Sequence, residues 1–398
     1  MSNIQEIVIS TPLRTAIGTF GGMLKDIPAS DLGATVAKGV LEDAQLDPGQ
    51  VDQVIVGNVL QAGQGMNPGR QVALKAGLPN RVPGMTLNRV CGSGLQAIIS
   101  AAQEIAVGGA QVILAGGIEN MDLAPFLLPK ARYGYRMAMP RADMLDEMVY
   151  DGLWDAFNNY HMGITAENVA ERHHISRQDA DAYALRSHQR ATQAMQDGFF
   201  LQQIVPVAVQ AKKETIPFTR DEHVRTDTSL EKLARLPAIF KPNGTVTAGN
   251  ASGINDAAAL MIVTTAQKAD ELKLPVAGRL VSYAVVGVDP AVMGIAMVPA
   301  TRQALEKAGL SVDDIAMFEV NEAYAAVAVY VGRELQIPEE KLNPVGGAVA
   351  LGHPIGASGA ILVVKLLHEL ERQQARYGLA TLCIGGGMGI AAVFERPS

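Results

Sequence analysis

The chain has 398 residues, of which 48% are hydrophobic and only 18% charged, and this balance excludes an intrinsically disordered protein. The formal net charge of −7 argues against nucleic acid as the main partner, although a local basic patch can still hold an anionic ligand. Two cysteines, Cys91 and Cys383, are too few for a disulfide framework, and no Cys-x-x-Cys pair indicates zinc. The length predicts roughly two to three domains, and the 40 glycines favour an α/β enzyme.

The chain shows no targeting or membrane-spanning signal. Residues 1–10 have no basic region followed by a long apolar run, and the final Glu-Arg-Pro-Ser is not a peroxisomal address. No apolar stretch reaches the ~20 residues that cross a bilayer. We therefore expect a cytoplasmic protein with reduced thiols and no membrane partner.

Two pairs of segments predict an internal repeat. Residues 41–59 and 305–323 are each typical of a helix end, an acidic turn and an apolar strand, and residues 110–118 and 379–387 are each typical of an apolar strand that ends in glycines. The order and the spacing match in the two pairs. The sequence therefore predicts two similar β/α halves with mixed strand pairing.

Each half also contains an unusually apolar helix. The run Leu95–Ala106 follows Cys91-Gly-Ser-Gly, and the run Ala360–Leu370 follows Gly356-Ala-Ser-Gly and is apolar nearly all round. A helix of that kind is enclosed on several sides. Two buried helices between two sheets predict a five-layer α/β/α/β/α body.

The amino-acid composition changes in the segment between the two halves. Residues 121–249 hold five of the seven histidines, and Ser176-x-x-Asp179 predicts a capped helix that runs to about Gln196. We interpret this region as a loop domain that covers the site, after which residues 257–264 return to the first sheet as a strand. The predicted units are residues 1–120 with 250–269 as the N-terminal half, 121–249 as the inserted loop domain, and 270–398 as the C-terminal half.

Cys91 lies at a predicted strand-to-helix turn. A thiol at a helix N-terminus faces the positive end of the helix dipole, which lowers its pKa and favours a thiolate nucleophile. The alternative is a small buried apolar residue.

His353 lies in the glycine-rich segment 346–359, which leads into the second buried helix. It is a candidate base for the proton of Cys91. The glycines alone also suggest a phosphate loop, but no Lys-Ser/Thr follows them. A structural, hydrogen-bonded histidine is the remaining alternative.

Two further candidates end predicted strands, where the sites of α/β proteins collect. Cys383 precedes a glycine run, so a second thiol can move protons to carbon while glycine amides stabilise an oxyanion; the alternative is an inert buried cysteine. Asn321-Glu322 ends the strand 315–320, and its alternative is an ordinary turn. The repeat brings Cys91, Asn321, His353 and Cys383 to corresponding edges of the two halves.

Seven motifs occur in order along essentially the whole chain. These are Asn88-Arg-Val-Cys-Gly-Ser-Gly, Gly116-Gly-Ile-Glu-Asn-Met, His161-Met-Gly-Ile-Thr-Ala-Glu-Asn, Gly244-Thr-Val-Thr-Ala-Gly-Asn-Ala-Ser-Gly-Ile-Asn-Asp, Asn321-Glu-Ala-Tyr, Gly352-His-Pro-Ile-Gly-Ala-Ser-Gly and Cys383-Ile-Gly-Gly-Gly. With them the chain resembles the thiolase family, of the acetyl-CoA acetyltransferase type. The resemblance implies the five-layer thiolase fold with an inserted loop domain.

The resemblance also implies the catalytic roles. Cys91 becomes the acylated nucleophile, His353 its activating partner, and Cys383 the acid/base that removes the α-proton of the second acetyl-CoA. Asn321 holds a water that joins His353 in one oxyanion hole, and the backbone amides of Cys91 and Gly385 form the other.

The remaining implications concern ligands and assembly. Coenzyme A (CoA) thioesters are substrates, and neither a metal nor a cofactor is expected. Family members are commonly homotetramers, built as dimers of dimers, in which part of the segment after Met121 joins the dimers. The residues expected to contact CoA are Leu153, His161, Met162, Arg225, Ala248 and Ser252, with Met293 and Tyr324 at the acyl end.

The chain departs from the family pattern at four places. Tyr324 stands where Phe is expected, Ala16 where Pro is usual, Ala296-Met297 where Gly-Pro is common, and Met388 where Gln is frequent. None of these changes removes a catalytic group. Tyr324 and Met297 bear on acyl preference.

The expected reaction is the reversible Claisen condensation of two acetyl-CoA to acetoacetyl-CoA and free CoA, through an acetyl-cysteine. One alternative is a degradative 3-ketoacyl-CoA thiolase for longer chains, but the resemblance links His161-Met162 to short acyl groups. The other is a non-catalytic acyl-CoA or lipid carrier, which the intact Cys91, His353 and Cys383 disfavour. The pathway stays open, because polyester storage, ketone use and sterol precursor synthesis all begin with this reaction.

Overall fold

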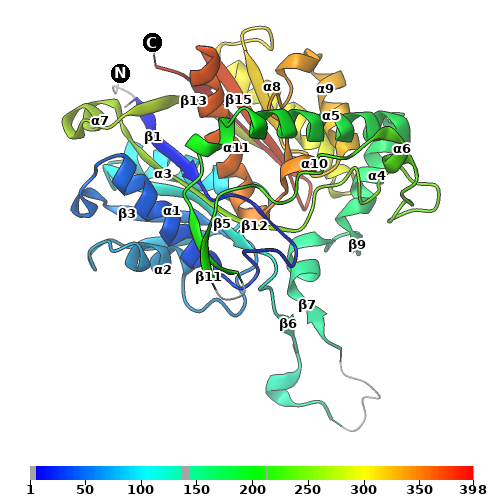
Figure 1. Ribbon diagram of the computed structural model, residues 1–398, viewed down its shortest axis with the longest axis horizontal. Helices are drawn as coiled ribbons and strands as arrows, with labels where there is room; N and C mark the ends of the chain where they lie inside the picture. Colours follow the sequence, from blue (N-terminus) through cyan, green and yellow to red (C-terminus); the bar gives the residue numbers. More distant parts are fainter. Residues whose placement is uncertain (1–5, 137–142, 212–213, 398) are drawn as a thin grey trace.

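We describe the protein from a computed structural model, in which residues 6–136, 143–211 and 214–397 are described. A single mixed sheet of ten strands forms its centre (Figure 1). Its order is β14-β15-β16-β13-β1-β12-β5-β3-β4, and the short β2 pairs with β12. The strands are β1 (Ile7–Arg14), β2 (Gly18–Thr19), β3 (Gln53–Gly57), β4 (Gly84–Leu87), β5 (Val112–Asn120), β12 (Asn255–Thr265), β13 (Val276–Gly287), β14 (Met317–Val320), β15 (Tyr377–Ile384) and β16 (Met388–Glu395).

The predicted repeat is confirmed by strand direction. In the N-terminal half β3 and β5 are parallel, and in the C-terminal half β14 and β15 are parallel. All nine residues of β5 are buried, as expected for a strand covered on both faces. Each parallel pair is connected through one of the two apolar helices that the sequence predicts.

The two halves share hydrogen bonds, which differs from the expectation of two separate sheets. Strand β1 pairs antiparallel with β12 on one side and with β13 on the other. Its register with β13 covers only three pairs and contains a shift after Ile9. The first strand of the chain therefore joins the two halves into one continuous sheet.

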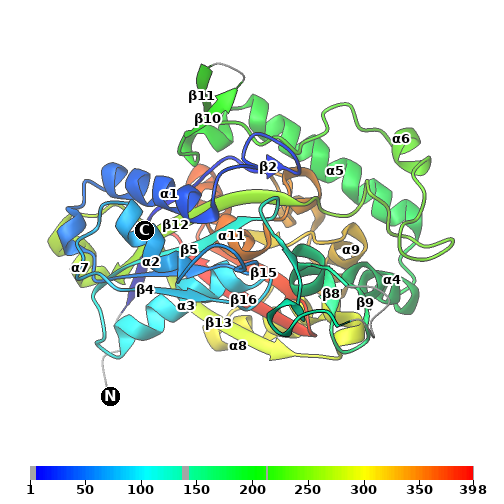
Figure 2. The ribbon, with the colours of Figure 1, turned by 90° about the horizontal axis from the view of Figure 1, so that it is seen from below.

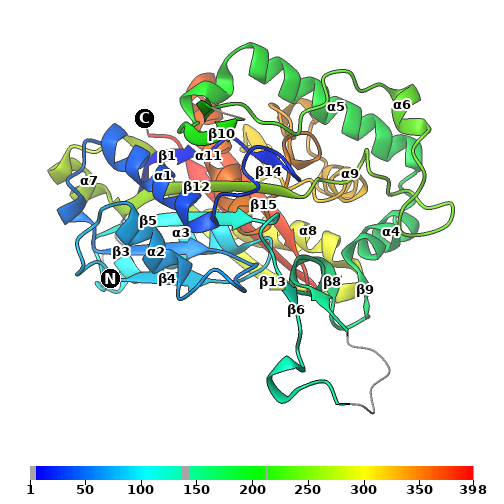
Figure 3. The ribbon, with the colours of Figure 1, turned by 60° about the horizontal axis from the view of Figure 1, so that its bottom comes forward.

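The predicted five layers are confirmed, because α11 (Ile355–Gln373) contacts strands of both halves of the continuous sheet, and these halves form the two β layers around the central helices. Helix α3 (Ser93–Ala106) contacts α11 in the interior (Figures 2 and 3). A Cβ added at Gly94 would lie 2.7 Å from the nitrogen of Ala360, so glycine is what lets these helices approach. The outer layers contain α1 (Ala29–Asp43) and α2 (Pro68–Lys75) against the N-terminal half, and α8 (Met297–Ala308) against the C-terminal half.

Helix α5 (Arg177–Gln196) lies along the top of the molecule in Figure 3 and belongs to the segment between β5 and β12. The predicted capping box is confirmed, because the side chains of Ser176 and Asp179 bond each other's backbone N–H groups. The strand predicted over 257–264 is confirmed as β12. The other elements of this segment are β6 (Phe126–Leu127), β7 (Leu145–Asp146), the π-helical turn Met148–Leu153, β8 (Trp154–Asp155), β9 (Tyr160–His161), α4 (Met162–Arg172), β10 (Val207–Ala211), β11 (Glu214–Phe218) and α6 (Leu230–Ala234).

The pair β6–β7 extends away from the body as an arm (Figure 1). Within the part of the chain that the structure describes, no helix has both the length and the apolar character needed to cross a bilayer. The remaining helices that position the site are α7 (Ala266–Leu272), the 3-10 turn Pro290–Ala296, α9 (Ala325–Glu334) and α10 (Ala348–Leu351).

Candidate active site

Cys91 lies in the turn between β4 and α3, as the sequence predicts. Val90 has a left-handed backbone (φ 44°), which turns the chain sharply before the helix begins at Ser93. The Ser93 hydroxyl closes this turn, because it accepts the N–H of Arg89 at 2.8 Å and donates to the carbonyl of Val90 at 2.7 Å. Local hydrogen bonding thus fixes Cys91 at the N-terminal end of a buried helix.

The expected low pKa of Cys91 is wrong for the unliganded protein. Burial of the thiol raises its pKa to about 11, although N–H groups of Gly385 and of Cys91 itself lower it in part and the charge of Glu119 raises it further. The residue as a whole is only half-buried, but the sulfur itself is enclosed. The resting Cys91 is therefore a neutral thiol, and it would need a base to act as the predicted nucleophile.

His353 has the protonation state of such a base. Its Nδ1 lies 2.6 Å from the Ser358 hydroxyl, which donates to the carbonyl of Pro354 at 2.9 Å and so must accept from Nδ1–H. That leaves Nε2 with a free lone pair. Burial lowers the pKa of His353 to about 4, so the imidazole is neutral at physiological pH.

Asn321 follows β14 and lies beside His353. Its side-chain Nδ2 is 3.4 Å from His353 Nε2, a contact in which the amide donates to the free lone pair. Its backbone N–H donates to Thr381 of β15 at 2.9 Å, two residues before Cys383. Among the described residues, the buried Oδ1 of Asn321 has no hydrogen-bond partner.

Cys383 ends the apolar part of β15 and is fully buried. Burial is the main cause that raises the pKa of Cys383 far above its usual range, and the charge of Cys91 adds to the effect. The pKa of Tyr324 is also raised, first by burial and then by the charges of Cys383 and Cys91. The two thiols and the tyrosine hydroxyl thus act on one another electrostatically, as the predicted site requires.

Apolar packing brings most of the predicted acyl-end residues to these thiols. Met162, Met293 and Tyr324 belong to the same buried cluster as Cys383. Leu153 packs with Cys91 in a smaller cluster that also holds Ile355, two residues after His353. The walls next to the two thiols therefore come from the inserted segment and from both halves.

His161 has a structural role in this wall. Its Nδ1 accepts the N–H of Gly163 at 3.1 Å and so caps α4, and its ring stacks on Phe240 at 4.6 Å. Phe240 in turn meets the Tyr324 ring edge-on at 6.5 Å. Phe240 was not predicted, because nothing in its local sequence distinguishes it from other loop aromatics.

The other predicted contacts lie on surrounding loops. Ser252 is half-buried and donates its N–H to Ala323 at 3.0 Å, next to Tyr324. Ala248 and Arg225 are exposed, and the backbone N–H of Arg225 donates to His188 of α5 at 3.1 Å. The structure does not bring Arg225 or Ala248 into contact with the thiols.

A buried carboxylate that was not predicted, Glu119, acts electrostatically on Cys91. It accepts the N–H groups of Val59 at 3.1 Å, Leu60 at 3.2 Å and Gly356 at 2.8 Å, as well as the side-chain amide of Asn58 at 2.6 Å. Burial raises its pKa to about 7. The available signal was an acidic residue inside the otherwise apolar strand β5.

Asn255 was also missed as a site residue. Its Oδ1 accepts the backbone N–H of His353 at 2.9 Å, and its Nδ2 donates to Gly18 at 2.9 Å. The His353 segment is thus held from β12 as well as from β5. Within the described ranges, no group of three or more His, Cys, Asp or Glu side chains is arranged to hold a metal ion.

Comparisons with known proteins agree with this geometry. The family model for the thiolase N-terminal domain matches residues 7–267, and that for the thiolase C-terminal domain matches residues 274–396. An acetyl-CoA acetyltransferase of Pseudomonas aeruginosa is 54% identical over 394 residues, which cover 99% of this chain and 100% of that protein.

Two solved structures show the same fold. The crystal structure of the Bacillus anthracis acetyl-CoA acetyltransferase matches with a TM-score of 0.96 and 42% identity, over 99% of each chain. That of human mitochondrial 3-ketoacyl-CoA thiolase in complex with CoA matches with a TM-score of 0.94 and 42% identity, over 99% of this chain and 98% of that one. The chain therefore belongs to the thiolase family.

Proposed function

We propose that the protein is an acetyl-CoA acetyltransferase, which joins two acetyl-CoA into acetoacetyl-CoA and CoA through an acetyl group on Cys91. The observation that carries the proposal is an enclosed, neutral Cys91 thiol in the same site as a neutral His353, whose Nε2 carries no proton and so can accept one. Cys91 packs in the apolar cluster that holds Ile355, two residues after His353. The Pseudomonas aeruginosa and Bacillus anthracis relatives bear the name of this activity.

In the first half-reaction His353 Nε2 takes the proton of Cys91, and the thiolate attacks the acetyl carbon of the first acetyl-CoA. The thioester oxygen becomes an oxyanion held by the N–H groups of Cys91 and Gly385. The C–S bond to CoA then breaks, and the leaving sulfur takes the proton of Cys383. The enzyme now holds acetyl-Cys91, an imidazolium and a Cys383 thiolate.

In the second half-reaction this thiolate removes the α-proton of a second acetyl-CoA. The strongly raised pKa of Cys383 supports this role, because a thiolate that binds its proton tightly is a strong base. The imidazolium, with a water held by Asn321, stabilises the enolate oxygen. The carbanion attacks the acetyl carbon, the bond to Cys91 breaks, and the Cys91 sulfur recovers its proton from His353.

Coenzyme A would enter along the inserted segment. Leu153 and Met162 share apolar clusters with the thiols, and His161 and Ser252 contact Phe240 and Ala323 in the adjoining wall. The exposed Arg225 and Ala248 suit the outer parts of a long ligand. The human thiolase to which the chain is similar was solved with CoA. The chemistry needs no metal or cofactor, because the thioesters themselves are the reactants.

The proposal includes a cytoplasmic homotetramer. The β6–β7 arm exposes large apolar side chains, which in a monomer would face water and which suit contact with a second copy. These are Phe126, Leu128, Tyr133 and Met144. Both cysteines are free thiols, which fits a reducing compartment.

A 3-ketoacyl-CoA thiolase for longer chains is the second candidate, because a protein of that name shares the fold at 42% identity. The cluster of Met162, Met293 and Tyr324 favours short chains. The deciding experiment compares kcat/KM for thiolysis of acetoacetyl-CoA and 3-ketohexanoyl-CoA by the purified protein. We expect a far higher kcat/KM for acetoacetyl-CoA. Equal values for the two substrates would support the second candidate. No thiolysis of either substrate would support the remaining alternative, a non-catalytic acyl-CoA or lipid carrier.

A further inference from the structure

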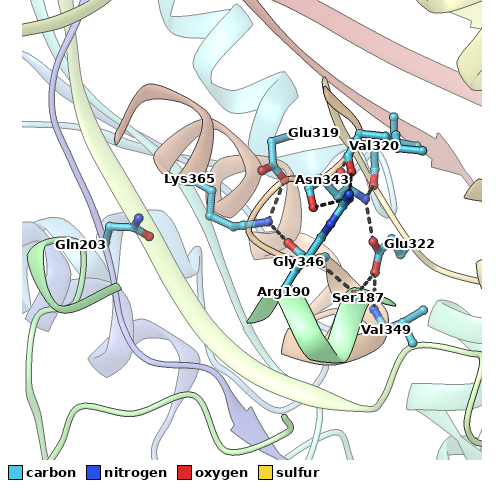
Figure 4. A network of polar contacts seen from close by, with 12 residues as sticks. Ser187, Arg190, Gln203, Glu319, Val320, Glu322, Asn343, Gly346, Val349 and Lys365 are labelled. Atoms are coloured by element: carbon cyan, nitrogen blue, oxygen red, sulfur yellow. Dashed lines mark hydrogen bonds and ion pairs between the residues drawn. The ribbon is translucent and has the colours of Figure 1, made fainter. Parts of the chain in front are cut away.

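Glu322 follows Asn321 in the chain and is only 1% exposed. Its Oε1 accepts the Tyr183 hydroxyl at 2.9 Å. It also accepts Asn343 Nδ2 at 2.7 Å through Oε1, and the Ser187 hydroxyl at 2.7 Å and the N–H of Val349 at 3.0 Å through Oε2 (Figure 4). All four partners donate, so the arrangement fits an ionised carboxylate. Nothing in the proposed chemistry uses this charge directly.

The four donors connect Glu322 to both groups of the proposed oxyanion hole. Val349 belongs to α10, and His353 follows the end of that helix by two residues. Asn343 also bonds both backbone groups of Val320, the residue before Asn321, at 2.8 Å each. One carboxylate therefore contacts the segment that carries His353 and the loop that holds the strand end before Asn321.

Helix α5 of the inserted segment encloses the Glu322 carboxylate on its remaining side. Ser187 accepts the N–H of Gly347 at 3.1 Å while its hydroxyl donates to Glu322. Tyr183 reaches the same carboxylate from one turn earlier in the helix. Glu322 is thus held between the inserted segment and the C-terminal half.

Two glycines in the 346–359 segment make this contact possible. A Cβ at Gly347 would lie 2.2 Å from the carboxyl carbon of Glu322, although its φ of −131° is open to any residue. Gly346 has a left-handed φ of 81°, and its Cβ would meet Ser187 O at 2.7 Å. These glycines therefore make room for α5 and Glu322, which explains them without a bound phosphate.

We propose that Glu322 is a positioning residue, which sets the 3.4 Å separation between Asn321 Nδ2 and His353 Nε2 and aims both groups at the reacting carbonyl oxygen. The inference rests on the proposed thiolase function. A displacement of ~1 Å in a reacting group costs about 100-fold in rate, so loss of this carboxylate affects turnover even where the fold survives.

The test is Glu322→Gln. The amide keeps the shape, but its NH2 group faces two donors, so the segments of Asn321 and His353 move apart. We expect kcat for thiolysis of acetoacetyl-CoA to fall about 10- to 100-fold while KM stays within about twofold. Alkylation of Cys91 by iodoacetamide, followed by mass spectrometry without any CoA substrate, should slow as well, because His353 no longer takes the thiol proton efficiently.

Glu369→Gln is the matched control. Glu369 is also fully buried, but it bonds Arg372 and Gln373 at the far end of α11. We expect a lower Tm with kcat unchanged. Should Glu322→Gln fail to fold, Ser187→Ala removes one of the four donors and should give a smaller fall in kcat.

A wild-type kcat in folded Glu322→Gln, or in Ser187→Ala where the former does not fold, would overturn the proposal, as would a raised KM with kcat unchanged. A wild-type protein without thiolysis would instead refute the proposed function. The alkylation rates of Cys91 would still report whether Glu322 positions His353.

Discussion

The Ser358 hydroxyl and the His353 ring are joined by a 2.6 Å contact that fixes the tautomer of the histidine. The hydroxyl has one hydrogen, which the carbonyl of Pro354 accepts, so Nδ1 must carry the ring proton. We predict that Ser358→Ala lowers kcat by about 10- to 100-fold, because the ring then samples the tautomer and orientation that cannot accept from Cys91. Steady-state kinetics would measure it. Ser282→Ala, which loses one buried hydroxyl bond to Ala304, is the control that should keep kcat.

The two half-reactions should separate in Cys383→Ala. Acetylation of Cys91 needs His353 and the departure of the CoA thiolate, which water can protonate when Cys383 is absent. Condensation also needs a base that removes the α-proton of the second acetyl-CoA, which is the role proposed for Cys383. We therefore expect acetyl on Cys91 by peptide mass spectrometry and a loss of condensation of at least ~10²-fold. Near-wild-type condensation in this variant would require another base, and acetyl found on Cys383 of the wild type alone would refute the role assignment.

Burial of neutral His353 makes stability depend on pH. The pKa is about 6.5 in the unfolded chain and about 4 in the folded protein, so the unfolded state binds more protons between these values. Stability therefore falls as pH drops from about 6.5 to 4. Other buried groups titrate in the same range, so the contribution of His353 is isolated by comparing two proteins. Between pH 7 and pH 5 the wild type should lose about 2 kcal/mol more of its free energy of unfolding than His353→Asn. Urea unfolding at both pH values would measure this, and equal losses would contradict it.

Tyr324 should restrict acyl length. Its hydroxyl is buried and feels the charges of Cys383 and Cys91, which together with burial raise its pKa, so the hydroxyl occupies space beside the thiols. We predict that Tyr324→Phe raises kcat/KM for 3-ketohexanoyl-CoA relative to acetoacetyl-CoA. Each methylene that finds an apolar contact gains about 0.8 kcal/mol, or roughly fourfold. Thiolysis of 2-methylacetoacetyl-CoA, which carries a methyl branch, tests whether the site excludes branched acyl groups as well as longer ones. If Tyr324→Phe and wild type give the same ratio of kcat/KM for the two substrates, the hydroxyl does not restrict acyl length.

Local sequence patterns were enough to predict much of the fold and the position of the candidate nucleophile. The capping box at Ser176, the strand β12 and the turn at Cys91 depend on residues close in sequence. Asn255 and Glu119 were not predicted as site residues, because they bond residues 98 and 237 positions away, His353 and Gly356. The pKa direction of Cys91 failed for the same reason, since the helix terminus is local whereas the enclosure of its sulfur comes from distant segments.

The place of β1 between β12 and β13 has a consequence for how the chain folds. Strand β1 pairs with strands more than 240 residues later in the chain, so its edges stay open while those residues are being synthesised. Contacts of such long sequence separation form slowly, and unpaired strand edges promote aggregation. A chain that stops before residue 276 can complete only one side of β1 and exposes the other. Neither half is a self-contained folding unit, and the N-terminal half expressed alone should aggregate more readily than the full chain.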